Sequence, residues 1–146
     1  MHLAPDVGKK AEIKGAGYNP APAQRIILLK PRTFMNLSGE AVAAAVKYYK
    51  VKLDDLIVAH DEIDLPLGKY RISRNASSAG HNGTQNIIDI LATKDFSRIR
   101  IGVDNRGDKK IATEKYVLGK FTAAEIKTIS KLLPEISEEF IKKFLI

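Results

Sequence analysis

The chain has 146 residues, 45% of them hydrophobic, which is enough for one compact domain with a packed core. Lysine and arginine number 24 against 17 acidic residues, so the net charge of +7 favours an anionic partner such as nucleic acid or an acidic membrane surface. The absence of cysteine excludes disulfides, thiolate metal sites and cysteine nucleophiles. The apolar runs are too short to cross a bilayer, and the first residues lack the apolar core of a signal peptide, so we expect a cytoplasmic protein.

The first part of the chain carries little periodic signal. Residues 1–23 are rich in proline, glycine and lysine, and only Lys10 to Lys14 suggest a short edge strand. The apolar run from Arg25 to Leu29 then predicts a buried strand. Ser38 is predicted to cap a helix that continues through Tyr48. These signals predict a strand, a loop and a helix in succession.

The middle of the chain predicts two strands around an acidic loop, followed by a helix. Leu56 to Ala59 form a short apolar run that ends in the polar cluster His60 to Asp64. Lys69 to Ser73 alternate as a half-buried strand does. A turn rich in glycine and serine, Asn75 to Gly80, leads into a helix with apolar residues from Ile87 to Leu91.

The last third predicts one more strand and two helices. Ile99 to Val103 form the strand. Thr122 and Glu125 have the spacing of a capping box, and Pro134 is predicted to open a final helix. Strands that alternate with helices predict an α/β fold. We expect a single domain over residues 1–146, with a mixed, mostly parallel twisted sheet and helices on both faces.

Four polar side chains stand out because ligand sites of such folds gather where strands end in loops. The amide of Asn36 offers a ligand both a donor and an acceptor, although a turn asparagine that bonds its own backbone is the more common case. Asp61 is suited to orient an imidazole or a water molecule, or to cap a turn. His81 and Asn82 lie between two glycines that permit close approach of a substrate, but a lone histidine is more often structural.

Basic residues form two short stripes by the two-residue period of strands. Lys69 and Arg71 share one face of their strand, and Arg98 and Arg100 share one face of theirs. Such stripes are suited to hold phosphates, and an ordinary solvated surface is the alternative. Further cations follow in the next loop: Arg106, Lys109 and Lys110.

Five segments in a fixed order give a more specific signal. They are Lys30 to Gly39 (KPRTFMNLSG), His60 to Pro66 (HDEIDLP), Gly80 to Gly83 (GHNG), Arg98 to Val103 (RIRIGV) and Tyr116 to Phe121 (YVLGKF). From about Ala11 through Phe121 the chain closely resembles the bacterial-type peptidyl-tRNA hydrolases. The resemblance implies an α/β monomer that hydrolyses the ester joining a peptide to the 3′ end of tRNA, with no metal and no organic cofactor. The acceptor arm of peptidyl-tRNA and its peptide are then the partners, with no membrane involved.

The resemblance also implies roles for individual residues. Asn36 and Asn82 match the amides that contact substrate in catalysis, and Asp61 matches the acid that partners the catalytic imidazole. His81 matches a supporting histidine of the active site. The remaining substrate-binding positions are the apolar Phe34 and the basic set that faces the tRNA acceptor arm: Arg71, Arg98 and Arg100.

The chain departs from the family pattern at its beginning. The family opens with a strand ending in Gly-Leu-Gly-Asn-Pro-Gly, followed by a Thr-Arg-His-Asn segment that carries the general base, and neither string occurs here. We therefore expect the chain to lack that N-terminal strand, the helix and the base, which neither His2 nor His60 matches. Ser73, Ala76 and Ala79 also replace residues typical of the family. A non-catalytic RNA-binding protein on the same scaffold is the alternative function.

Overall fold

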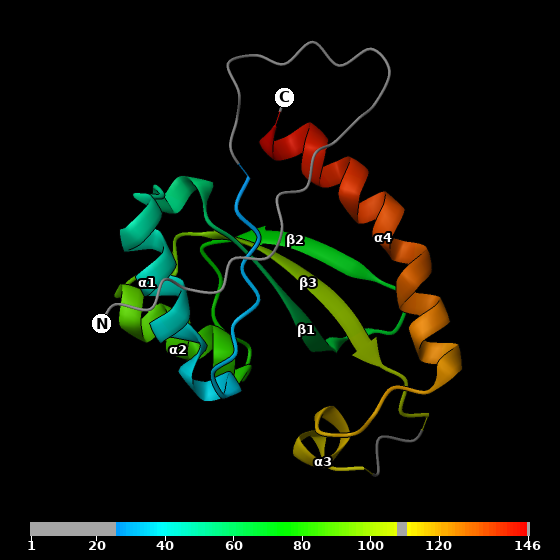
Figure 1. The fold of residues 1–146 in the computed structure, drawn as a ribbon. Helices are drawn as coiled ribbons and strands as arrows, with labels where there is room; N and C mark the ends of the chain where they lie inside the picture. Colours follow the sequence, from blue (N-terminus) through cyan, green and yellow to red (C-terminus); the bar gives the residue numbers. More distant parts are fainter. Residues whose placement is uncertain (1–25, 108–110, 146) are drawn as a thin grey trace. The chain divides into compact units, whose positions relative to one another are not determined.

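The computed structural model describes residues 26–107 and 111–145 (Figure 1). They group into two compact units. The first unit comprises the described residues up to Lys52 together with Ser78–Thr93, and the second comprises Leu53–Ser77 together with the described residues from Lys94 onward. Among the described residues, no helix is long and apolar enough to span a membrane.

The regular elements described in the first unit are helices. A 3₁₀ turn, η1 (Met35–Leu37), runs directly into α1 (Ser38–Tyr49), and the second helix is α2 (Asn82–Leu91). Both α1 and η1 pack against α2, and the two helices lie side by side in Figure 1. Residues three apart share a helix face, which explains why Val42 and Ala45 are buried together while α2 buries Ile87.

A glycine fixes how closely the two helices approach. The backbone N–H of Gly39 donates to Oδ1 of Asn86 at 2.8 Å. A Cβ atom on Gly39 would lie 2.5 Å from the backbone oxygen of Asn86, a distance that real Cβ atoms do not adopt. The first turn of α1 therefore contacts α2 backbone to backbone, which requires the absence of a side chain.

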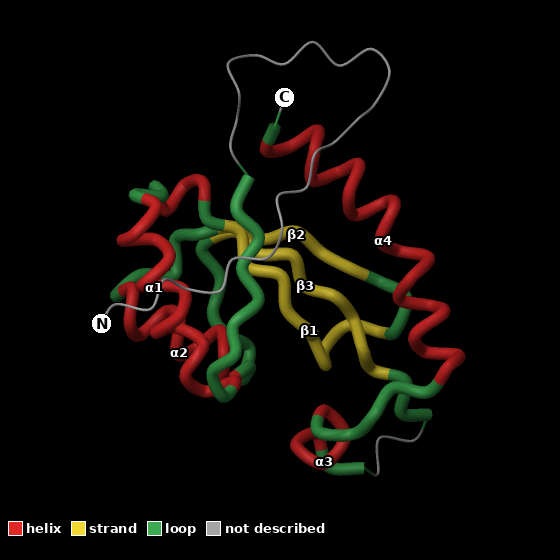
Figure 2. The backbone as a smooth tube through the Cα atoms, in the orientation of Figure 1, coloured by secondary structure: helices red, strands yellow, loops and turns green. Residues whose placement is uncertain are grey.

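The second unit contains the sheet, drawn in yellow in Figure 2. Its strands are β1 (Ile57–Pro66), β2 (Tyr70–Arg74) and β3 (Ser97–Asp104), in the order β1-β3-β2. β1 pairs with β3 in parallel, and β2 pairs with β3 antiparallel. The predicted α/β class and mixed sheet are confirmed, with one pair of each kind. One domain over residues 1–146 and helices on both faces stay predictions.

Two α-helices and one 3₁₀ turn complete the second unit: η2 (Leu53–Asp55), α3 (Thr113–Val117) and α4 (Ala123–Phe144). The predicted capping box is confirmed, because the side chain of Thr122 accepts from the Glu125 N–H and Glu125 accepts from the Thr122 N–H. α4 runs beside β2, and the Tyr70 hydroxyl donates to Glu139 on α4 at 2.6 Å.

The predicted start of a helix at Pro134 is wrong, because Pro134 lies inside the continuous helix α4. Proline has no N–H, so the carbonyl of Ser130 loses its helical partner. Both Ser130 and Pro134 are exposed, and water can therefore bond that carbonyl. The helix continues past the proline for this reason.

Two further predictions near the start of the described residues are wrong. Residues 26–29 form no strand, and Ile26 and Leu28 are exposed, so the apolar run is not buried as its composition predicts. Ser38 does not cap α1: its hydroxyl donates to the Met35 carbonyl at 2.7 Å, because η1 continues into the helix and leaves Leu37 at the cap position. The predicted strand at Lys10 to Lys14 lies outside the described residues.

The predicted loop from His60 to Asp64 is also wrong, because these residues belong to β1, and His60 to Glu62 pair with β3. Parallel pairing with β3 supplies backbone hydrogen bonds that outweigh the low strand propensity of the acidic residues. The other predicted strands and helices lie within about two residues of those observed, apart from the missed short helix α3.

We expect Gly39→Ala to lower the free energy of unfolding by about 1 to 3 kcal/mol, because the new methyl group must push α1 away from the backbone of α2. Gly107→Ala is the matched control, since nothing lies within 4 Å of a Cβ at that position. Urea denaturation of both variants measures the difference. Equal stabilities would show that the α1–α2 contact tolerates a side chain.

Candidate functional site

Asn36, His81 and Asn82, named here the amide–histidine cluster, lie in the first unit. Asn36 belongs to η1 and Asn82 opens α2, and both are exposed. The turn and the helix meet at Gly83, where a Cβ atom would lie 2.5 Å from Sδ of Met35 and 3.2 Å from its carbonyl oxygen. The structure therefore brings the two predicted amide segments together, and a second glycine permits the close approach.

His81 is the N-cap residue of α2. Its Nδ1 accepts a hydrogen bond from the backbone N–H of Thr84 at 3.1 Å. The preceding loop turns through a left-handed backbone at Ala79 and Gly80, and the His81 N–H donates to the Ser78 carbonyl at 3.0 Å. These bonds hold the imidazole ring at the start of α2, next to Asn82.

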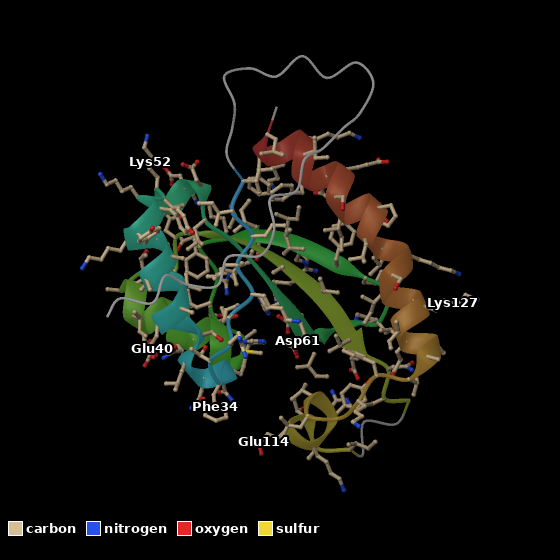
Figure 3. The ribbon with its side chains drawn as sticks, in the orientation of Figure 1. Phe34, Glu40, Lys52, Asp61, Glu114 and Lys127 are labelled. Carbon is tan, nitrogen blue, oxygen red and sulfur yellow. The ribbon has the colours of Figure 1, made fainter. Side chains whose placement is uncertain are left out.

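Apolar side chains flank Asn36. Phe34 is 80% exposed and Met35 is 57% exposed, although large hydrophobic side chains are usually buried. The Phe34 carbonyl accepts from the Leu37 N–H at 2.9 Å, which fixes the η1 turn beneath the two side chains. Phe34 is labelled in Figure 3. The surface around Asn36 thus combines an amide with exposed apolar groups.

His60, Arg100 and Arg71, named here the cross-strand row, lie side by side across β1, β3 and β2 in the second unit. The register pairs Arg100 with His60 on one side and with Arg71 on the other. Directly paired residues project from the same face of a sheet, so two guanidinium groups share that face. Arg71 is exposed.

Arg100 is held by a buried carboxylate. Its Nε and Nη2 each lie 2.8 Å from Oε2 of Glu62, which is only 3% exposed. The other oxygen of Glu62 accepts from the Asp64 N–H at 3.1 Å. Both contacts use one edge of the guanidinium, so Nη1 points to the other side of the group. Glu62 therefore fixes the orientation of Arg100.

Arg98, which the sequence analysis placed in the basic stripe, is 1% exposed. Its Nη1 donates to the Ser77 carbonyl at 2.8 Å, and its Nη2 donates to the Ala76 carbonyl. Burial, and after it the positive charge of Arg100, lowers the pKa of Arg98. The interpretation of Arg98 as a surface cation is wrong, because the guanidinium is used to hold the loop after β2.

Asp61 lies in β1 between His60 and Glu62, and Figure 3 labels it on the strand. Its register partner on β3 is Ile101, the neighbour of Arg100. Successive side chains of a strand project to opposite faces, so Asp61 lies on the face opposite the cross-strand row. The structure therefore separates the predicted catalytic acid from the predicted phosphate-binding cations. Asp61 is half-buried.

Comparison with known proteins gives the same family in three ways. The model of the family described as peptidyl-tRNA hydrolase matches residues 3–145. The peptidyl-tRNA hydrolase of Bacillus cytotoxicus is 41% identical over 132 residues, which cover 88% of this chain and 69% of the relative. That of Staphylococcus saprophyticus is 44% identical over 125 residues, which cover 85% and 65% of the two chains. The chain belongs to the peptidyl-tRNA hydrolase family.

Solved structures agree with this assignment to the peptidyl-tRNA hydrolase family. A crystal structure of the peptidyl-tRNA hydrolase from Acinetobacter baumannii matches with a TM-score of 0.63 and 32% identity, covering 71% of this chain and 52% of that one. A second, of a peptidyl-tRNA hydrolase in complex with N-propanol, has a TM-score of 0.69 at 30% identity and covers 80% and 58% of the two chains. This member of the family thus spans about half of the length of the solved chains.

Sequence reasoning missed two residues that support the candidate site of this peptidyl-tRNA hydrolase family member. Glu62 was read as part of an acidic loop, so its place on the same strand face as His60 was not recognised. Asn86 follows Asn82 by one helical turn, a spacing that puts both on one helix face and was available from the sequence. The partner of each residue, Arg100 and Gly39, lies far away along the chain.

We expect Arg98→Ala to lower the free energy of unfolding by about 2 to 4 kcal/mol, because two loop carbonyls lose a charged donor and a buried side chain is removed. Arg71→Ala removes an equally charged but exposed side chain and should change stability by no more than about 0.5 kcal/mol. Thermal and urea denaturation of both variants provide the measurement. An Arg98→Ala protein as stable as the parent would contradict the structural role and restore the interpretation of Arg98 as a surface cation.

Proposed function

We propose that this protein hydrolyses the ester bond between the peptide and the 3′ end of tRNA in peptidyl-tRNA, and so recycles tRNA during translation. One observation supports the proposal: the contact of η1 with the start of α2 brings together the segments that carry Asn36, His81 and Asn82. Membership of the peptidyl-tRNA hydrolase family supports it. A non-catalytic RNA-binding role is less favoured, because binding alone needs no such gathering of amides and an imidazole.

The chemistry of ester hydrolysis matches this set of groups. Water attacks the carbonyl carbon, the carbonyl oxygen becomes negative, and the bond to the ribose 3′ oxygen then breaks as that oxygen takes a proton. Side-chain N–H donors aimed at the developing oxyanion lower the barrier, and we assign this task to the amides of Asn36 and Asn82. The exposed Phe34 offers an apolar contact for the peptide.

We assign Asp61 to orient the imidazole of the general base, as a carboxylate does in other hydrolases. The base itself is assigned to none of the three histidines of the sequence. His2 and His60 do not match the family segment that carries it, and the ring of His81 is committed to capping α2. The proposal places the base in the family's Thr-Arg-His-Asn segment, a string absent from these 146 residues.

The tRNA acceptor arm is proposed to contact the cross-strand row. Arg71 and Arg100 present two guanidinium groups on one face of the sheet, and a guanidinium fork matches the oxygens of a phosphate. Arg98 is left out of this set, because its donors bond loop carbonyls. We further propose that the protein acts as a cytoplasmic monomer and uses neither a metal nor an organic cofactor.

We expect tRNA affinity to fall with salt, since each neutralised phosphate contributes about 0.7 to 0.9 to the slope of log affinity against log salt. Arg71→Ala and Arg100→Ala should each reduce that slope by about one contact. Lys52→Ala, which removes one exposed positive charge from the first unit, is the control and should leave the slope unchanged. Fluorescence anisotropy with a labelled acceptor-stem RNA, at several salt concentrations, measures the slope for each protein. Slopes that are equal in all proteins would refute the assignment.

In a longer form that includes the family's Thr-Arg-His-Asn segment, we expect Asp61→Asn to reduce turnover by about 10²- to 10⁴-fold, because an amide neither fixes the tautomer of the incoming imidazole nor stabilises the imidazolium. The affinity for tRNA should stay within about twofold, since Asp61 and the cross-strand row lie on opposite faces of the sheet. Single-turnover hydrolysis and equilibrium binding are measured on the same preparations. Equal losses in both would make Asp61 a structural or binding residue.

A further inference from the structure

The hydrogen bond between Thr84 and His81 determines which ring nitrogen of His81 carries the proton. A backbone N–H can only donate, so the Nδ1 atom that lies 3.1 Å from the Thr84 nitrogen must offer a lone pair. The hydroxyl of Thr84 lies 3.3 Å from the same Nδ1. A neutral imidazole that accepts at Nδ1 carries its hydrogen at Nε2.

Burial makes this tautomer costly to change. Thr84 is 1% exposed, so water cannot replace the ring as the acceptor for its N–H. The backbone on both sides is fixed as well: the His81 N–H donates to Ser78, and the His81 carbonyl accepts from the Gln85 N–H at 2.9 Å. Gly83 leaves room for the ring, whose Cε1 lies 3.1 Å from the place where a Cβ would be.

From this geometry we infer that His81 serves the reaction as a hydrogen-bond donor through Nε2 and not as the base that activates water. The inference rests on the proposed function for its substrate, an ester carbonyl, and deepens it. A base needs an unprotonated nitrogen, and the one that His81 has is already used by the helix. Protonation at Nδ1 would break the cap, which disfavours the other tautomer by roughly tenfold or more.

The inferred role agrees with the neighbours of His81. Asn82 follows it in the chain, and Asn36 lies on the turn that packs against α2. Both amides carry N–H donors, so the amide–histidine cluster consists of donors suited to an oxygen that becomes negative. A single donor of this kind commonly contributes about 10²- to 10³-fold to kcat.

A spectroscopic measurement tests the tautomer without reference to activity. Long-range ¹H–¹⁵N correlation spectra of the protein labelled at its histidines identify the protonated nitrogen of each ring, and loss of one signal set in His81→Asn assigns His81. We expect the Nε2–H form when the ring is neutral. An Nδ1–H ring would overturn the inference.

Substitutions test the role in the reaction, in the protein extended by the family's Thr-Arg-His-Asn segment that carries the proposed base. His81→Asn keeps an acceptor that caps helices well but has no imidazole Nε2–H, so we expect stability close to that of the parent and kcat lower by about 10²- to 10³-fold, with little change in KM. Its pH–rate profile should keep the parental shape, because the proposed base lies elsewhere in the family's sequence. Full activity, or the loss of one limb of the profile, would overturn the donor role.

The controls separate capping from chemistry. His81→Ala loses both the cap and the donor, so it should be less stable than His81→Asn and equally slow. Thr122→Ala removes the capping box of α4, and it should lose stability but keep the parental kcat. If the protein extended by that segment failed to hydrolyse peptidyl-tRNA while its His81 showed the Nε2–H form, the proposed function and the donor role would fall and the tautomer would stand.

Discussion

The contact between η1–α1 and α2 is the constraint on which the candidate chemistry depends. It exists because Gly39 and Gly83 have no side chains, so each lets one segment approach the other within ordinary contact distance. The Gly39 N–H to Asn86 bond then fixes the register of the two helices. Without this packing, Asn36 would belong to an exposed turn with no defined neighbour. With it, the segments that carry two amides and one imidazole lie together.

In the second unit, strand pairing gives residues of the same charge different partners and therefore different roles. Arg98 and Arg100 project from the same face of β3, two residues apart. Arg98 bonds two loop carbonyls and is buried, whereas Arg100 bonds the carboxylate of Glu62 with one edge of its guanidinium. Asp61 takes the opposite face of the sheet. The role of each residue depends on its neighbours, and the register of the strands determines those neighbours.

The proposed reaction uses two kinds of group: those that donate hydrogen bonds and those that act through their charge. The amide–histidine cluster supplies N–H donors, and the capping bond of Thr84 prevents its imidazole from acting as a base. In the proposal, Asp61 supplies the charge that orients a base, and the cross-strand row supplies cations for phosphate. The assignment of donors, acid and cations thus rests on separate contacts.

The amino-acid sequence by itself determined the α/β class, most of the helices and strands, the capping box at Thr122 and the family. These features depend on periodic burial, on hydrogen bonds within one helical turn and on ordered motifs, all of which are local along the chain. The candidate residues Asn36, Asp61, His81 and Asn82 were recognised from such motifs, and their roles remain proposals.

Only the tertiary structure decided which partners distant residues meet. It decided that Arg98 is buried, that Glu62 holds Arg100, and that the acidic run after Ala59 continues a strand. It also decided that Pro134 lies inside α4 and that the Nδ1 of His81 accepts a hydrogen bond from the first turn of α2. Sequence patterns indicate the period of a helix or strand and the face that it buries. The atoms that lie against that face are set by register and by close packing between segments far apart in the chain.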